Sequence, residues 1–147
     1  MAGIKKGGIR ITLFTLDEAN QQIEWLRPTL ERMVSLKREF DRVQREVDVH
    51  SLATSGASPE NPDARALATL EKRRLELGEE LGKGVQAIHR RGILLKDLDR
   101  GLVDFYTVSG DRLIFLCWRL GEPSIAHWHT LEGGFAARQP LDRTELE

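Results

Sequence analysis

The chain has 147 residues, of which 40% are hydrophobic and 31% charged, a composition typical of one globular domain rather than a disordered chain. Its formal net charge is -1 and basic residues are interleaved with acidic ones, which disfavours nucleic acid and anionic membranes as partners. The single cysteine, Cys117, excludes an internal disulfide, and a reducing cytoplasm is the expected location. Neither a signal peptide nor a run of about 20 apolar residues is present, so no membrane contact is expected.

A strand followed by a long helix is predicted at the start of the chain. Residues 9–14 alternate between apolar and polar side chains until the last step, as in a half-buried strand. Thr15 and Glu18 then form a capping-box pattern, which predicts a helix over 16–48. Pro28 lies inside this helix and predicts a kink, because proline removes one backbone hydrogen bond. The apolar seam of the helix has nearly the heptad spacing of a coiled coil and contains Ile23, Leu26, Leu30, Met33, Phe40 and Val47.

A second helix is predicted over 63–91, after a loop at 50–63 that lacks periodicity. Gly92 follows in the position that commonly ends a helix. The two helices should pair as a long antiparallel hairpin that protrudes from the rest of the domain. Gly78 and Gly82 share one face, where they either admit a close backbone contact or are tolerated on an exposed surface. The seam of the second helix contains Leu67, Leu70, Leu77, Leu81 and Ile88.

Beyond Gly92 the apolar period shortens toward 2, which is typical of strands. A short apolar run occupies 93–95, strands are predicted at 102–108, 113–118 and 125–129, and turns at 109–111 and 121–123. Residues 92–138 should therefore form a small antiparallel β-meander of three strands, or of four if residues 9–14 join it. The expected fold class is α+β, a helical hairpin plus a meander within one domain of residues 1–147.

The segment Leu113–Trp118 is apolar at every position, so this strand should be covered on both faces. The helical hairpin can cover one face. The other face requires the helix ends, the C-terminal tail or a second subunit. We expect a homodimer on this ground, with a protein partner as a further option.

Motifs in two parts of the chain resemble one known family. They are Phe14–Asn20, Gly92–Phe105, Cys117–Glu122 together with Trp128–His129, and Gly134–Arg138. These motifs are similar to those of an uncharacterised bacterial family, the domain of unknown function 2203. The resemblance spans essentially the whole chain. It implies a fold family without an assigned activity, so the chemistry has to be inferred from the residues.

Five polar residues are candidates for a site at the end of the meander: His129, Glu122, Arg138, Asp104 and Lys96. In such a site Arg138 would hold an anion, while His129 and Glu122 would carry protons or bind a ligand, with Lys96 at the rim. Aspartate is disfavoured within a strand, so a buried Asp104 would need a basic partner. The candidate partners of Asp104 are Arg138, Lys96 and Arg119.

A metal site is the second option for this region. His127 and His129 are two residues apart on a predicted strand, so their side chains share a face and could bind one ion. Glu122, Cys117 or Glu132 could complete the ligand set. Alternatively, His127 and His129 bind no metal and form hydrogen bonds at the end of the strand, beside Trp128. Cys117 itself is either a nucleophile with a histidine base or, within its apolar run, a small hydrophobic residue.

The acidic segment Lys96–Gly101 superficially resembles a calcium loop. Asp97 and Asp99 have the spacing of the first two ligands, but Leu102 stands at the sixth position, where such a loop needs glycine. We therefore expect a turn in which aspartate side chains bind nearby N–H groups and Gly101 adopts a positive φ.

Two functions of different classes fit these residues. The sequence favours a non-enzymatic protein-interaction or oligomerisation module, because the hairpin is long and no recognisable catalytic motif is present. The alternative is a small-molecule-binding or metal-dependent enzyme with its polar site at the end of the meander. Nucleic-acid binding, through His89–Arg91 with Lys5, Lys6 and Arg10, has weaker support. Catalytic residues and a cofactor stay unassigned at this level.

Overall fold

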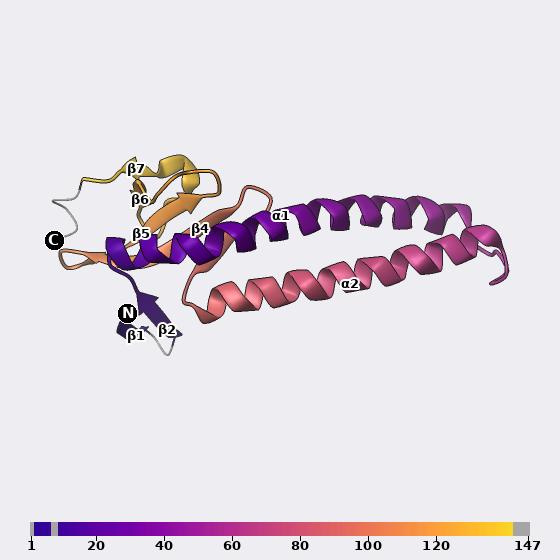
Figure 1. Ribbon diagram of the computed structural model, residues 1–147, viewed down its shortest axis with the longest axis horizontal. Helices are drawn as coiled ribbons and strands as arrows, with labels where there is room; N and C mark the ends of the chain where they lie inside the picture. Colours follow the sequence, from indigo (N-terminus) through magenta and orange to yellow (C-terminus); the bar gives the residue numbers. More distant parts are fainter. Residues whose placement is uncertain (1, 7–8, 143–147) are drawn as a thin grey trace.

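The computed structural model describes residues 2–6 and 9–142, with side chains described from residue 10 onward. Two helices, α1 (Leu16–Ala53) and α2 (Pro62–Arg90), form a long hairpin, and a mixed sheet lies at its base (Figure 1). The expected α+β class with a helical hairpin is thus confirmed. In the described part of the chain, neither helix has the length and apolar character that crossing a membrane requires.

Helix α1 begins at the predicted capping box. The backbone N–H of Glu18 donates to Thr15 Oγ1 at 3.1 Å, and the N–H of Thr15 donates to Glu18 Oε1 at 2.9 Å. The helix continues through Pro28 and past the predicted end at residue 48, to Ala53. Residues 50–53, which we assigned to the loop, are therefore helical.

Helix α2 begins with Pro62 in its first turn, after Asn61, whose side chain accepts a hydrogen bond from the N–H of Asp63 at 2.8 Å. Gly92 follows the helix with φ of 80°, the left-handed conformation that favours glycine after a helix. A Cβ at this position would also lie 2.4 Å from Thr12 Cβ. Gly92 is therefore required both by the backbone conformation and by the close approach of the N-terminal strand.

The two helices pack along their predicted seams. A small cluster of Val43, Val47 and Leu77 holds the outer part of the hairpin together. Nearer the base, a Cβ at Gly84 would lie 2.7 Å from Met33 Sδ, whereas one at Gly82 would meet no atom within 4 Å. A Cβ at Gly78 would meet only the Phe40 side chain, at 3.7 Å, so neither glycine of the predicted pair makes a close backbone contact, and Gly84 instead makes room for the Met33 side chain.

The sheet is larger than the predicted meander. It contains β1 (Ala2–Lys6), β2 (Ile9–Leu13), β3 (Leu94–Asp97), β4 (Leu102–Ser109), β5 (Arg112–Arg119), β6 (His127–His129) and β7 (Gln139–Pro140). Strands β4 to β6 pair antiparallel in succession, as expected, and β3 adds to them by pairing antiparallel with β4. The N-terminal hairpin of β1 and β2 joins β4 through a parallel pair, Leu13 with Tyr106, so the sheet is mixed. Three short strands were not predicted: β1, β7 and β3, of which the last overlaps the apolar run at 93–95.

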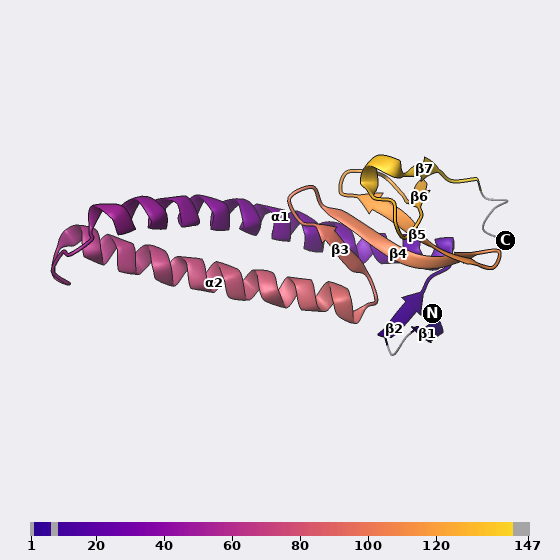
Figure 2. The ribbon, with the colours of Figure 1, turned by 180° about the vertical axis from the view of Figure 1, so that it is seen from behind.

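The two faces of β4 and β5 have different covers. One face packs against α1, where Val103, Phe105, Leu116 and Trp118 join the α1 residues Leu26 and Leu30 in the main core. The opposite face lies under the segment 130–138, which contains a short 3-10 helix, η1 (Phe135–Ala137). Figure 2 shows this segment, in yellow, on the outer side of the sheet. The C-terminal tail is therefore the second cover that the apolar strand requires.

Candidate functional site

Three polar side chains meet on the sheet face opposite α1. Asp104 on β4 is the direct cross-strand partner of Cys117 on β5, and His129 lies on the neighbouring strand β6. Each of the three is 2–3% exposed. One potential ligand atom from each residue lies within 4.8 Å of the other two, and within residues 10–142 this is the one such group of metal-ligand type. The sheet thus holds a carboxylate, a thiol and an imidazole together in a buried cluster.

The hydrogen bonds of His129 place one proton on Nδ1 and require a second proton at the contact of Nε2 with Asp104. Nδ1 lies 2.7 Å from the backbone carbonyl oxygen of Thr130, and Nε2 lies 3.0 Å from Asp104 Oδ2. A carbonyl oxygen can only accept, so Nδ1 carries a proton and donates it. The contact between Nε2 and Oδ2 then also needs one proton, held either by the imidazole or by the carboxyl group. Without that proton, a nitrogen lone pair would face a carboxylate.

Burial dominates the electrostatics of the other two groups. Burial raises the pKa of Asp104 above its usual value, although the nearby His129 and Lys96 oppose this shift. Burial, followed by the charge of Asp104, raises the pKa of the Cys117 thiol to about 12. Because both His129 nitrogens are engaged, the imidazole has no free atom to deprotonate Cys117. The arrangement therefore does not support the interpretation of Cys117 as a catalytic nucleophile.

A pocket opens beside the cluster. Its volume is about 110 Å³, and Asp104, Cys117 and His129 all line it. Lys96 also lines the pocket, with its Nζ 4.7 Å from the centroid of the Phe115 ring. The remaining walls consist of Leu102, Leu131, Gly133, Gly134 and Phe135. A mostly apolar pocket with a few converging polar groups is the usual form of a small-molecule site.

Strand alternation along β3 places Lys96 at this pocket, because Leu94 is paired with Asp104 and Lys96 is two residues further on the same face. The register between β3 and β4 shifts between Leu95 and Asp97, so Lys96 leaves the regular ladder. The turn after it is fixed as predicted: the N–H of Arg100 donates to Asp97 Oδ1 at 3.2 Å, and Gly101 has φ of 66°.

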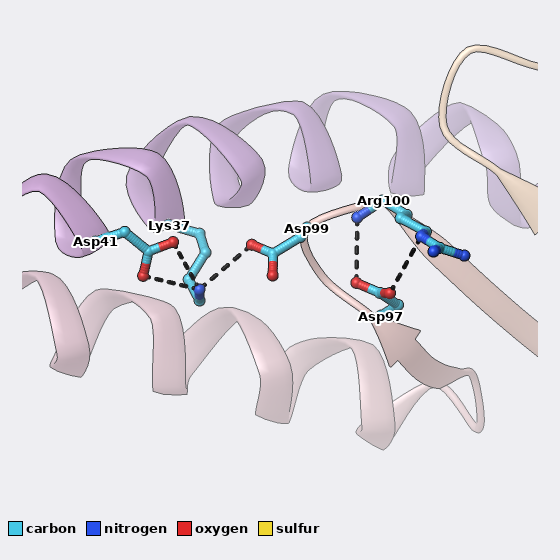
Figure 3. Close-up of polar contacts among 5 residues, drawn as sticks. All are labelled: Lys37, Asp41, Asp97, Asp99 and Arg100. Carbon is cyan, nitrogen blue, oxygen red and sulfur yellow. Dashed lines mark hydrogen bonds and ion pairs between the residues drawn. The ribbon is translucent and has the colours of Figure 1, made fainter.

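The same turn is tied to the helical hairpin. The Nζ atom of Lys37, on α1, lies 2.9 Å from Asp41 Oδ2 and 3.3 Å from Asp99 Oδ1. Figure 3 shows both contacts. These contacts hold the turn between β3 and β4 against α1, and Lys96 lies at the start of this turn.

Glu122 is the centre of a second polar cluster nearby. Arg138 donates to both oxygens of Glu122, at 3.0 and 2.9 Å, and the N–H of Arg119 donates to the same carboxylate at 2.7 Å. Burial alone would raise the pKa of Glu122, but Arg138 and Arg119 together lower it below its usual value. His127 Nδ1 lies 3.6 Å from Glu122 Oε2. Arg138 also contacts the Cys117 thiol, so the two clusters adjoin.

The five candidate site residues thus fall into two adjacent groups. Asp104, His129 and Lys96 lie at the pocket, whereas Glu122 and Arg138 pair with each other beside it. The partner of Asp104 is His129, which was not among the three cations we considered. The metal-ligand trio of His127, His129 and Glu122 is not brought together either, since His129 groups with Asp104 and Cys117. Glu132 is exposed and lies outside the cluster.

Comparison with known proteins gives one match. Residues 12–141 match the family described as "Uncharacterized conserved protein (DUF2203)". No curated protein and no solved structure matches the chain.

Proposed function

Since the chain belongs to the DUF2203 family, whose description assigns no activity, we propose from the site alone that the protein binds a divalent transition-metal ion, zinc foremost. Asp104, Cys117 and His129 would be the protein ligands, and the adjoining pocket would receive a small molecule. The function is then that of a metal-dependent small-molecule protein. The observation that carries the proposal is that these three groups meet in a buried cluster, with His129 and Asp104 sharing one proton.

The ligand chemistry supports zinc. Thiolate sulfur, imidazole nitrogen and carboxylate oxygen are its usual ligands, and three protein ligands with one open position are typical of catalytic zinc sites. With bonds of about 2.0–2.3 Å, ligand atoms around a tetrahedral zinc ion lie about 3.3–3.8 Å apart. The longest separations, up to 4.8 Å, would therefore contract by about 1 Å, whereas the 3.0 Å contact between His129 and Asp104 would widen slightly. The open position would face the pocket that the same three residues line.

The surroundings of the cluster support the same conclusion. Metal-binding histidines usually donate their other N–H to a carbonyl or carboxylate, which orients the ring. The contact of His129 Nδ1 with the Thr130 carbonyl supplies this bond. A bound cation would also replace the shared proton and stabilise the thiolate of Cys117, thereby relieving the cost of burying these groups.

Cobalt binding provides the direct test. The purified protein is titrated with Co²⁺, and the expected result is a 1:1 complex with a thiolate-to-cobalt charge-transfer band. Cys117→Ser should abolish the band and weaken binding at least about 10-fold, the usual minimum for losing a ligand or its support. Zn²⁺ should displace Co²⁺ in competition.

A matched pair of variants on β6 tests the specificity of the ligand set. His129→Asn should lose metal, whereas His127→Asn, two residues away on the same strand, should retain it. Circular dichroism of both variants reports whether the fold persists. A wild-type protein that binds no Co²⁺ at micromolar concentrations, or equal binding by the two variants, would refute the proposal.

The outer end of the hairpin supports a second candidate function. Val49 and Leu52 lie there on α1 and are 64% and 83% exposed. Two exposed apolar side chains at a helical spacing of three fit the expected interaction or oligomerisation module. The homodimer remains a prediction, and light scattering at tens of micromolar tests it. A monomeric mass would contradict the dimer without affecting the metal site.

A further inference from the structure

Resting on the metal site proposed above, we infer that the pocket takes a small oxyanion, such as a carboxylate, as the fourth ligand of the ion. Lys96 is the side chain that binds and orients this anion. The inference adds a ligand class and a specificity residue to the site. Three observations carry it: the charge of the loaded site, the placement of Lys96 and the size of the pocket.

The charge of the loaded site favours an anion. A divalent ion bound by one carboxylate, one thiolate and a neutral imidazole carries no net charge. Glu122 and Arg138 form their own bidentate pair and cancel each other. Lys96 then remains as one uncompensated positive charge, because the metal neutralises Asp104, its nearest acidic neighbour at the pocket. A monoanion at the open position restores neutrality.

The placement of Lys96 fits this role. Alternation along β3 puts Lys96 on the same sheet face as Asp104, and its side chain lines the pocket. Within residues 10–142 its ammonium group has no hydrogen-bond or ion-pair partner, and its described contact is with the face of the Phe115 ring. The ammonium group therefore keeps its donors available for a ligand.

Arg138, which the sequence suggested as the anion-binding residue, is less suited to that role. Its guanidinium group is already engaged by both oxygens of Glu122. An anion at Arg138 would have to displace an internal carboxylate held by two charge-assisted hydrogen bonds. An anion at Lys96 displaces no internal acid.

The pocket limits the size of the anion. Its volume of about 110 Å³ is below the roughly 150 Å³ of an apolar cavity that holds benzene. Acetate and similarly small carboxylates fit this volume, whereas a nucleotide does not. The apolar walls formed by Leu102, Phe115, Leu131 and Phe135 lower the local dielectric and strengthen the attraction between anion, ion and Lys96.

The experiment uses the full chain loaded with Co²⁺. Acetate is added and the visible absorption bands of cobalt, which report its coordination, are recorded. Acetamide has nearly the same shape without the charge and serves as the matched ligand. We expect saturable changes with acetate and none with acetamide at equal concentration.

Three variants locate the effect. Lys96→Met retains an unbranched apolar side chain over Phe115 and should weaken acetate binding about 10-fold or more, or about 1.4 kcal/mol. Its affinity for Co²⁺ should stay within about twofold of wild type, because Lys96 is not a ligand. Lys96→Arg should retain acetate binding. Lys83→Met removes a lysine from the hairpin surface and controls for the change in net charge.

The outcomes separate this inference from the proposed function. Failure of Co²⁺ to bind refutes the metal site and the inference with it. Stoichiometric Co²⁺ binding with an absorption spectrum that acetate leaves unchanged refutes the inference alone. An acetate response that persists undiminished in Lys96→Met likewise refutes the role assigned to Lys96.

Discussion

Metal binding at this site should release about two protons per ion at neutral pH. The first is the thiol proton of Cys117, which is fully retained at pH 7 because burial raises the pKa of this group to about 12. The second is the proton between His129 Nε2 and Asp104 Oδ2, whose place the ion would take. The proton on His129 Nδ1 stays, since it is donated to the Thr130 carbonyl in both states.

This proton count sets the pH dependence of the affinity. Metal binding coupled to the release of two protons strengthens about 100-fold for each unit of rising pH, equivalent to about 2.7 kcal/mol. The slope applies over the pH range in which the free protein holds both the Cys117 thiol proton and the proton between His129 and Asp104. A site of exposed, already ionised carboxylates would show almost no slope.

Calorimetry measures the release directly. Zinc is titrated into the protein at pH 7 in two buffers with different enthalpies of ionisation, and the difference in heat gives the number of protons. Cys117→Ser should release about one proton, since a serine hydroxyl remains protonated. A wild-type value near zero would show that the shared proton and the thiol proton are not displaced, and would refute the proton assignment.

Two further predictions concern stability. Gly82→Ala should raise the free energy of unfolding by about 1 kcal/mol, because alanine favours the helix. Gly84→Ala should stabilise the protein less, or destabilise it, because its Cβ would meet Met33. Equal increases of the two variants in urea unfolding would contradict the close contact between Gly84 and Met33. Glu122→Gln should cost about 1–3 kcal/mol at pH 7 by weakening the pair with Arg138. Because the folded state lowers the pKa of Glu122, its contribution is complete above about pH 4.5 and is lost as the pH falls through the folded value, so the difference between the two proteins should shrink on acidification below pH 4.5.

The helices could be predicted closely because their signals are local. Thr15 and Glu18 lie three residues apart, and Gly92 follows the second helix closely, so the start of α1 and the end of α2 each depend on a few neighbouring residues; the end of α1, which lacks such a signal, was placed five residues too early. The strands β1 and β7 were missed for the opposite reason. Gln139–Pro140 is too short to show any alternation, and the strand at Ala2–Lys6 contains two lysines in five residues.

The pairing of Asp104 with Cys117 was missed through a shift of one residue in the turn. We predicted a three-residue turn at 109–111, which would place Asp104 opposite Leu116. The structure has Ser109 paired with Arg112 and a two-residue loop between them, with Gly110 at φ of 63°. A shift of one residue moves a side chain to the opposite face, so the predicted register separated Asp104 from Cys117. The position of His129 depends on pairing between β5 and β6 across a longer connection, whose predicted turn at 121–123 does not by itself fix the register.

The buried cluster has no evident value for the stability of the sheet. A carboxylate, a thiol and an imidazole are together less favourable in this position than apolar side chains of similar volume, because each polar group loses its hydration. The main core lies on the opposite face against α1, and the apolar residues of the C-terminal segment could cover an apolar surface equally well. Natural proteins depart from such local rules chiefly at functional sites. The polar trio therefore supports the proposed metal site at this face of the sheet, and the adjoining pocket would give a ligand access to it.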